Sequence, residues 1–180
     1  MKKLNKDNKG FSLVELLVVI AIMVVLVGVI APSLLSNIEK TREAKDFQAL
    51  DTIAGNIQAA MVNEDVYDAI IAKNGAAIDL QDAYKGNAFT GTGVDNANAK
   101  LKSSLEDSLA AKAVFTSDDA AGDISLFGSK TAANAIDGGA KIYFSVDKTT
   151  GEVKVTLGTK DGSGNVTAAT GKSVDFTVTR

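Results

Sequence analysis

Residues 9–31 read KGFSLVELLVVIAIMVVLVGVIA, and this stretch decides how the chain is organised. The 21 residues from Phe11 to Ala31 contain a single charged side chain, Glu15. At about 1.5 Å per residue they form a helix of about 31 Å, which matches a bilayer hydrocarbon core of about 30 Å. The sequence therefore predicts a membrane-spanning helix over residues 11–31.

The charges around this helix predict its orientation. Residues 1–10 carry four lysines and one aspartate, and a basic flank stays on the cytoplasmic side while the rest of the chain crosses. A secretory signal has an apolar core of about 7–15 residues followed by a small-residue cleavage site. Here the core is longer and leads into a further helical pattern, so we do not expect a cut after it. Glu15 needs a positively charged partner, because an ionised group at the centre of a membrane helix costs about 2.5–3.5 kcal/mol, and less near its end.

The tract KGFSLVE, residues 9–15, resembles the class III processing and methylation signal of type IV pilins and pseudopilins. The resemblance implies that a prepilin peptidase cleaves between Gly10 and Phe11 and that the new N-terminal Phe11 is N-methylated. Glu15 then occupies the fifth mature position, where the family has a glutamate. The Phe11 ammonium of one subunit can pair with Glu15 of a neighbour at low dielectric constant. The alternative is an ordinary single-pass anchor, with Glu15 near the headgroups and Gly10 in a turn.

Beyond the apolar stretch, the sequence predicts an amphipathic helix that continues the spine over residues 32–62. Its apolar positions recur every three or four residues: Leu34, Leu35, Ile38, Phe47, Leu50, Ile53, Ala54, Ile57, Ala60 and Met61. Its charged positions are expected on the other faces: Glu39, Lys40, Arg42, Glu43, Lys45 and Asp46. Pro32, together with Gly28, is expected to kink the helix, and resembles the proline at this position of type IV pilins. The alternative is that Pro32 opens a separate second helix.

Residues 63–180 are expected to form a globular head. A short helix or a continuation of the spine is predicted at 66–72, ended by the Asn74-Gly75 turn, followed by a loop over 86–98. Asn98 is expected to cap a helix through Lys112, whose inner face would carry Leu101, Leu105 and Leu109.

The C-terminal part of the head has a period of two, which is typical of strands. The apolar alternate positions are Ile142, Phe144, Val146, Val153, Val155, Leu157, Val174, Phe176 and Val178. Turns are predicted at 147–151 and 160–165. The fold class is therefore α+β: a long N-terminal α-helical spine, half membrane-spanning and half amphipathic, packed on a small antiparallel β-sheet head. The expected segments are a leader at 1–10, the membrane helix at 11–31, the amphipathic half at 32–62 and the head at 63–180.

The composition argues against several functions. The chain has no cysteine and no histidine, so it offers no thiolate or imidazole, and we predict no enzyme activity, no cofactor and no metal site. Without the leader it keeps 15 basic and 21 acidic residues, which does not suggest nucleic-acid binding. The absence of cysteine departs from the disulfide-bounded loop of many pilin relatives and fits Gram-positive pilins better.

Two polar clusters have side chains that could bind a metal ion. Asp161, Ser163 and Asn165 alternate like the first half of a calcium loop, but Lys172 stands where the closing glutamate belongs. We therefore interpret them as turn residues. A second cluster is interpreted as a loop and a helix cap, and comprises Asp95, Asn96 and Asn98.

Three functions compete. By the resemblance, the chain is expected to be a structural subunit of a type IV pilus for adhesion, twitching motility or biofilm formation. Its partners would be copies of itself in a helical homopolymer, the prepilin peptidase, the platform protein with its ATPase machinery, and the cytoplasmic membrane before assembly into an extracellular pilus. The nearest alternative is a pseudopilin of a type II secretion or competence system. The third is a membrane-anchored binding domain that never polymerises.

Overall fold

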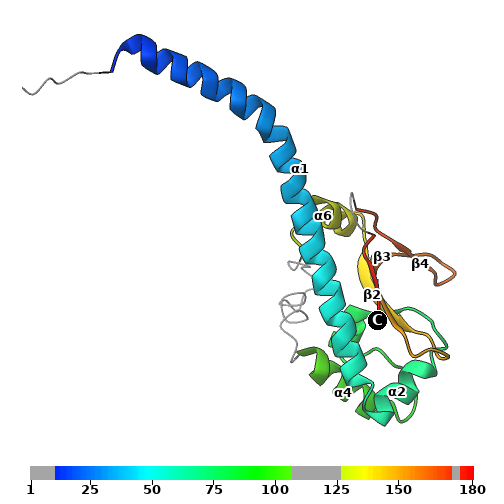
Figure 1. Cartoon of the computed structure of the whole chain (residues 1–180). Helices are drawn as coiled ribbons and strands as arrows, with labels where there is room; N and C mark the ends of the chain where they lie inside the picture. The colour runs from blue at the N-terminus through cyan, green and yellow to red at the C-terminus, as the bar shows by residue number, and fades with distance from the viewer. Residues whose placement is uncertain (1–10, 107–126, 172–174) are drawn as a thin grey trace, which may run out of the picture. The chain divides into compact units, whose positions relative to one another are not determined.

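The computed structural model describes residues 11–106, 127–171 and 175–180 (Figure 1). The chain divides into two compact units, Met1–Ile38 and Glu39–Arg180. One helix, α1 (Leu13–Ala60), contributes to both units. The second unit adds a small antiparallel sheet and short helices, so the chain has the predicted α+β fold: a long N-terminal helix packed on a small antiparallel sheet.

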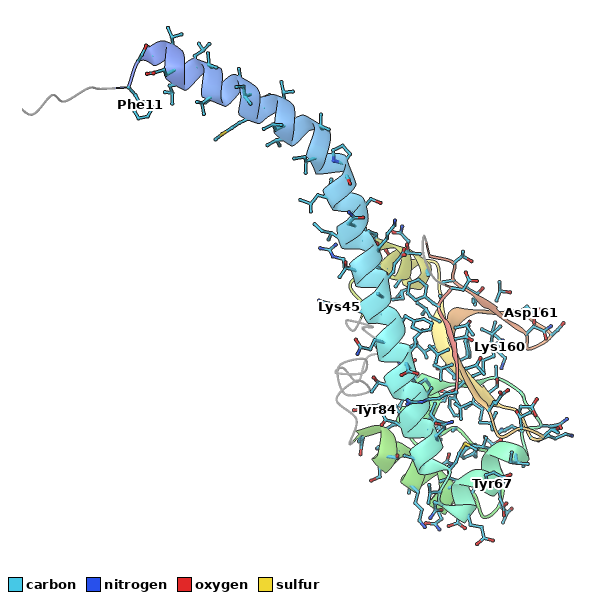
Figure 2. The ribbon with its side chains drawn as sticks, viewed as in Figure 1. Phe11, Lys45, Tyr67, Tyr84, Lys160 and Asp161 are labelled. Carbon is cyan, nitrogen blue, oxygen red and sulfur yellow. The ribbon has the colours of Figure 1, made fainter. Side chains whose placement is uncertain are left out.

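The part of α1 in the first unit is apolar and exposed. Its large hydrophobic side chains run from Leu13, which is 80% exposed, to Ile38, which is 40% exposed. Phe11, labelled in Figure 2, precedes the helix and is 91% exposed. The best 18-residue window has a mean hydropathy of 3.2, and none of it is buried. Within the described residues, this is the one helix long and apolar enough to cross a membrane. The helix continues through Pro32, so that residue does not open a separate second helix, whereas a kink at Gly28 and Pro32 stays a prediction.

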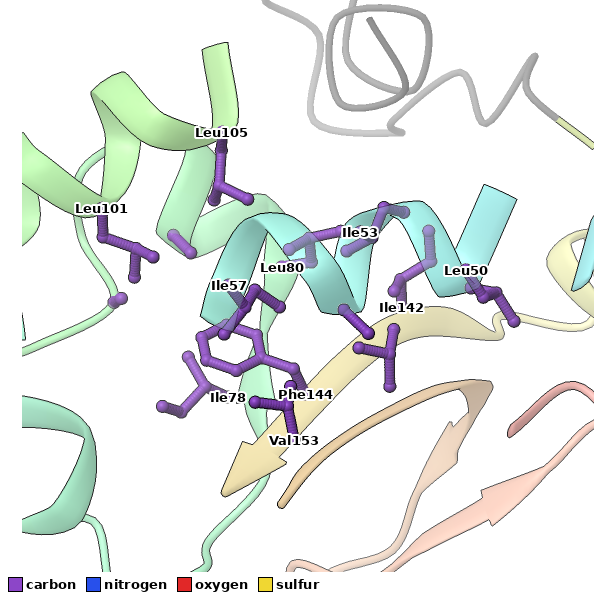
Figure 3. Packing of buried hydrophobic residues seen from close by; sticks show 14 of the residues in the cluster. Leu50, Ile53, Ile57, Ile78, Leu80, Leu101, Leu105, Ile142, Phe144 and Val153 are labelled. Atoms are coloured by element: carbon purple, nitrogen blue, oxygen red, sulfur yellow. The ribbon is translucent and has the colours of Figure 1, made fainter. Parts of the chain in front are cut away.

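The part of α1 in the second unit supplies one wall of the hydrophobic core. Its fully buried side chains repeat at helical spacing, and they are Leu50, Ile53, Ala54 and Ile57. Figure 3 shows them packed with Ile142, Phe144 and Val153 of the sheet. The predicted apolar stripe is confirmed from residue 47 onwards, but Leu34, Leu35 and Ile38 are exposed. Within the described residues, burial of this stripe therefore begins at residue 47, and the predicted bounds of the amphipathic half stay a prediction.

Three of the charged residues assigned to the exposed faces of α1 are in fact buried. Glu39, Glu43 and Asp46 are 8%, 0% and 2% exposed, and their spacing places them on one face. We call these three residues the acid row. They face the start of α6 (Lys130–Asp137), where the first backbone N–H groups of a helix lack partners and carry partial positive charge.

The acid row accepts hydrogen bonds from this helix start. Asp46 accepts from the backbone N–H of Gly128 at 2.8 Å and of Ser129 at 2.9 Å. Glu39 accepts from the N–H of Lys130, and Glu43 from the hydroxyl of Thr131. The prediction of an exposed charged face is therefore wrong at these positions, because carboxylates that accept backbone hydrogen bonds can be buried.

The sheet is antiparallel and centred on β3 (Val153–Lys160). Its order is β1 (Ile78–Asp79), β2 (Lys141–Val146), β3 and β4 (Val166–Ala168), and β5 (Thr177–Thr179) also pairs with β3. β4 and β5 pair with the same edge of β3, β4 with residues 158–160 and β5 with residues 154–156. The apolar alternate positions of β2 and β3 are buried, as predicted, and face the core shown in Figure 3.

A glycine permits the close approach of β3 and β4. A Cβ atom at Gly158 would lie 2.0 Å from the backbone oxygen of Thr167, a distance no side chain tolerates. The two predicted turns also follow their sequence chemistry. In the first, Asp147 accepts from the N–H groups of Thr149 and Thr150 at 2.7 and 3.0 Å, and Gly151 takes a φ of 76°.

The remaining helices partly agree with the prediction. Helix α2 (Glu64–Ile71) is confirmed, and the chain turns after it through Asn74 and Gly75, both with positive φ. Helix α4 (Asp95–Glu106) buries Leu101 and Leu105 as predicted. Leu109, Lys112, Lys172 and Val174 lie outside the described residues. Elements that were not predicted are β1, β4, α3 (Leu80–Tyr84) and α6.

Asn98 does not cap α4, because the helix begins at Asp95 and Asn98 lies inside it. Its side chain is 8% exposed. Its amide oxygen accepts from the N–H of Phe89 at 3.0 Å, and its amide nitrogen donates to the carbonyl of Phe89 at 2.9 Å. Asn98 therefore fixes the loop that precedes α4.

Candidate processing and assembly site

The predicted cleavage site lies at the start of the described chain. Gly10 is outside the described residues, and Phe11 is highly exposed. Helix α1 begins two residues later, at Leu13. A protease that cuts before Phe11 would therefore act on a residue outside the helix, but the cleavage itself stays a prediction.

Glu15 has a local partner that the sequence analysis missed. The backbone N–H of Ser12 donates to Oε2 of Glu15 at 2.9 Å, and the N–H of Val14 donates to the Ser12 hydroxyl at 3.3 Å. This is a variant of the capping box: the glutamate at the third helical position accepts from the backbone N–H of the residue before the helix, and the Ser12 hydroxyl caps the N–H of the second helical residue. The spacing Ser-x-x-Glu ahead of an apolar run is the sequence signal that could have revealed it.

The capping box changes how Glu15 is interpreted. Its carboxylate accepts a backbone hydrogen bond within one subunit, which stabilises the helix start and lowers the cost of an acid at the edge of an apolar segment. The N–H of Ser12 is neutral, however, so no positive charge within the described residues compensates Glu15. Pairing with the Phe11 ammonium of another subunit stays a prediction. The bond from Ser12 does not neutralise the charge of Glu15, so the carboxylate still requires a cation.

Residues of both candidate metal clusters form hydrogen bonds within the head, local ones in the first cluster and a long-range one in the second. Asp161 accepts from the N–H groups of Ser163 and Asn165 at 2.9 and 2.8 Å, and the bond from the Asn165 N–H lowers the pKa of Asp161 below its usual value. Asn96 donates to Asp65. Across the described ranges, no group of three or more acidic side chains is arranged to hold a metal ion. The contacts of Asp161 support the interpretation of the first cluster as turn residues, whereas Asp95, Asn96 and Asn98 lie inside α4, so the interpretation of the second cluster as a loop and a helix cap is wrong.

The comparisons with known proteins find one match. Residues 5–31 match the family model of the prokaryotic N-terminal methylation motif. This match confirms the resemblance of residues 9–15 to a class III signal, and the proteins of this motif family are structural rather than catalytic. No curated protein and no solved structure matches the chain.

Proposed function

We propose that this chain, a type IV pilin-like or pseudopilin precursor by its N-terminal motif, is a structural subunit of a type IV pilus. Such a motif implies processing by a prepilin peptidase and handling by an assembly machinery. In this proposal, cleavage between Gly10 and Phe11 and methylation of Phe11 convert a membrane-anchored precursor into a filament subunit. The filament serves adhesion, twitching motility or biofilm formation.

The observation that carries the proposal is the exposed apolar half of α1. Its large hydrophobic side chains are exposed, from 80% at Leu13 to 40% at Ile38. In the membrane, lipid covers this surface, but outside the membrane it must be buried against other subunits. At about 25 cal/mol per Å² of apolar area, that burial supplies a large free energy before the entropic costs of association are deducted. Repeated head-to-tail contacts that do not close into a ring produce an open helical polymer.

Glu15 sets the register of this polymer. In a stack of parallel apolar helices, a lone carboxylate strongly prefers the position where it meets a cation. The new ammonium of a neighbouring Phe11 is such a cation, and it exists only after cleavage. Assembly is thereby made conditional on processing, which keeps precursors from associating within the membrane.

Two alternatives share the N-terminus. A pseudopilin of a secretion or competence system would polymerise by the same contacts into a short structure. A membrane-anchored binding domain would keep its apolar helix in lipid and never polymerise. Electron microscopy of cells labelled with an antibody to residues 33–180 separates them: long labelled surface filaments support the pilus, whereas label confined to the envelope contradicts it.

The test of the mechanism is Glu15→Gln. The glutamine side chain keeps an oxygen that can accept from the Ser12 N–H but carries no charge, so it preserves the capping box and removes the proposed ion pair. We expect normal membrane insertion and cleavage, and a loss of most surface filaments. The matched control is Ser12→Ala, which removes the cap hydroxyl and keeps the charge, and which should retain filaments.

Either of two outcomes contradicts the proposal. Filaments at normal yield from Glu15→Gln would show that the charge of Glu15 is not needed for assembly. Mass spectrometry of the exported protein should find Phe11 as the first residue with one added methyl group. If residues 1–10 were still attached, the chain would be an ordinary anchor.

A further inference from the structure

The face of the sheet that points away from the core carries a groove of about 570 Å³. It is formed by the loop after α2, by β2 and β3, and by the turn between β3 and β4. The strand residues that line it include Tyr143 and Lys154, which alternate with the buried residues of the core. A volume of this size lies within the range of about 300–1,000 Å³ that is typical of ligand sites.

Three lysines meet in this groove, which we call the lysine groove. They are Lys73, Lys154 and Lys160, and no aspartate or glutamate is among the lining residues. Within the described residues, none of the three forms an ion pair, whereas the nearby Lys141 pairs with Asp79 at 2.9 Å. The chain as a whole is acidic, so this uncompensated positive charge is a local feature.

The side chain of Lys160, labelled in Figure 2, makes two contacts with neighbouring groups. Its ammonium donates to the carbonyl of Ala77 at 2.9 Å and lies 5.8 Å from the centre of the Tyr143 ring. Both contacts leave the positive charge of Lys160 uncompensated, because neither partner is an anion. A fixed cation loses less side-chain entropy on binding than a mobile one.

The other lining groups indicate which anion fits. The aromatic side chains of the groove, Tyr143 and Phe144, are 9% and 1% exposed, so they offer no platform on which nucleic-acid bases could stack. The exposed polar residues are Asn74, Ser163 and Asn165. The Asn74 oxygen accepts from Lys148 at 2.6 Å and the Asn165 amide nitrogen donates to Asp161 at 3.3 Å. The Ser163 hydroxyl, the Asn74 amide nitrogen and the Asn165 amide oxygen are suited to hydrogen bonds with sugar hydroxyls. Lysine ammonium groups complement carboxylates.

We propose that the lysine groove binds a segment of an acidic polysaccharide, with uronate carboxylates on Lys73, Lys154 and Lys160 and sugar hydroxyls on the polar rim. Charge complementarity selects an anionic chain, the polar rim favours one that carries hydroxyl groups, and the low exposure of Tyr143 and Phe144 disfavours single-stranded nucleic acid. The inference does not depend on polymerisation, since the groove is complete within one subunit.

The test is binding of a mannuronate hexamer to the full processed subunit in detergent, measured by isothermal titration calorimetry. The neutral comparison is maltohexaose, and the nucleic-acid comparison is a thymidine hexanucleotide. We expect binding of the mannuronate hexamer that weakens as salt is raised, and no binding of maltohexaose. The double variant Lys73→Gln/Lys154→Gln should bind at least about tenfold more weakly.

The matched control is Lys40→Gln/Lys85→Gln, which changes the net charge equally at two exposed lysines outside the groove and should bind like the parent chain. The proposal is overturned if the parent chain does not bind the mannuronate hexamer, if maltohexaose or the thymidine hexanucleotide binds at least as tightly, or if the control loses as much affinity as the groove variant. The salt dependence and the maltohexaose comparison use only the parent chain, so they decide the question even if the groove variant misfolds.

Discussion

The two halves of α1 have the same secondary structure and opposite relations to solvent. From Leu13 to Ile38 the helix exposes its large apolar side chains, and from Leu50 to Ala60 it buries them in a core. A helical conformation alone therefore does not show whether the apolar side chains of a segment are buried in the core of the same chain. What differs is the partner: the second half packs on the sheet of the same chain, whereas the large apolar side chains of the first half stay exposed in the described residues.

The acid row marks the beginning of the second half. Between Glu15 and Glu39 the chain has no charged residue, and at Glu39 carboxylates begin to bind the start of α6. The polar contacts of the head therefore begin at the same point of the sequence as its compact unit. This suggests that substitutions in the two halves act on different properties, which the following variants test in order of expected effect.

The largest effect is expected from Leu50→Ala. Leu50 is fully buried, and its truncation should lower the free energy of unfolding of the head by about 2–5 kcal/mol, because the cavity adds to the lost burial. The matched change Leu26→Ala, at a residue that is 54% exposed, should leave that free energy within about 0.5 kcal/mol of the parent value. The measurement is denaturant unfolding of the processed chain in detergent. Equal destabilisation by both variants would contradict the conclusion that only the second half of α1 belongs to the hydrophobic core.

A backbone clash should come next. Gly158→Ala places a Cβ against the Thr167 carbonyl, so β3 and β4 must separate, at a cost of about 3 kcal/mol, the upper end of ordinary overpacking effects. Gly162→Ala is the control in the neighbouring turn, where a Cβ would meet no atom within 4 Å. Thermal unfolding followed by circular dichroism measures both. If Gly158→Ala unfolds at the parental temperature, the close approach of the two strands is wrong.

The acid row gives a smaller, specific effect. Asp46→Ala leaves the N–H groups of Gly128 and Ser129 without their acceptor, which costs about 1–3 kcal/mol. Lys45→Ala removes an exposed charge at the adjacent position and should be close to neutral. Hydrogen exchange of the amides at the start of α6 should speed up in Asp46→Ala only. Unchanged exchange would show that these carboxylates do not hold α6.

The smallest effect concerns the two turns. Hydrogen bonds to the N–H groups of Thr150 and Asn165 lower the pKa values of Asp147 and Asp161, respectively, below the usual 3.8. Their contribution to stability is therefore present above about pH 4 and disappears as the pH falls through the lowered values. We expect Asp147→Asn/Asp161→Asn to unfold at a slightly lower temperature than the parent chain near neutral pH, and this difference to shrink as the pH falls below the usual pKa of 3.8. If the difference in unfolding temperature does not shrink in acid, the ionised carboxylates are not its cause.

The sequence predicted the features that depend on neighbours close along the chain. The apolar run from Phe11 to Ala31 specifies an apolar helix, and the alternation in β2 and β3 specifies a half-buried hairpin. The turns at 147–151 and 160–165 follow from side chains that bind their own backbone. These patterns were sufficient for the α+β fold.

The features that were missed depend on distant partners. Asp46 binds N–H groups more than 80 residues away, so a period of 3.6 could only place it on a polar face. Asn98 appeared to be a helix cap because its partner, Phe89, lies in a loop without a pattern. Strands as short as β1 have too few residues for an alternation to be visible. At the processing site, the capping box was visible in the sequence, but the charge of Glu15 directed attention to an intermolecular partner.

The turn at 147–151 has a consequence for durability. A protease binds its substrate as an extended strand, and the hydrogen bonds from Thr149 and Thr150 to Asp147 hold this exposed corner in a bent conformation instead. Digestion at that corner would first require those bonds to break. In a chain without disulfides, hydrogen bonds between a side chain and its neighbouring backbone are one way for an exposed turn to resist proteolysis.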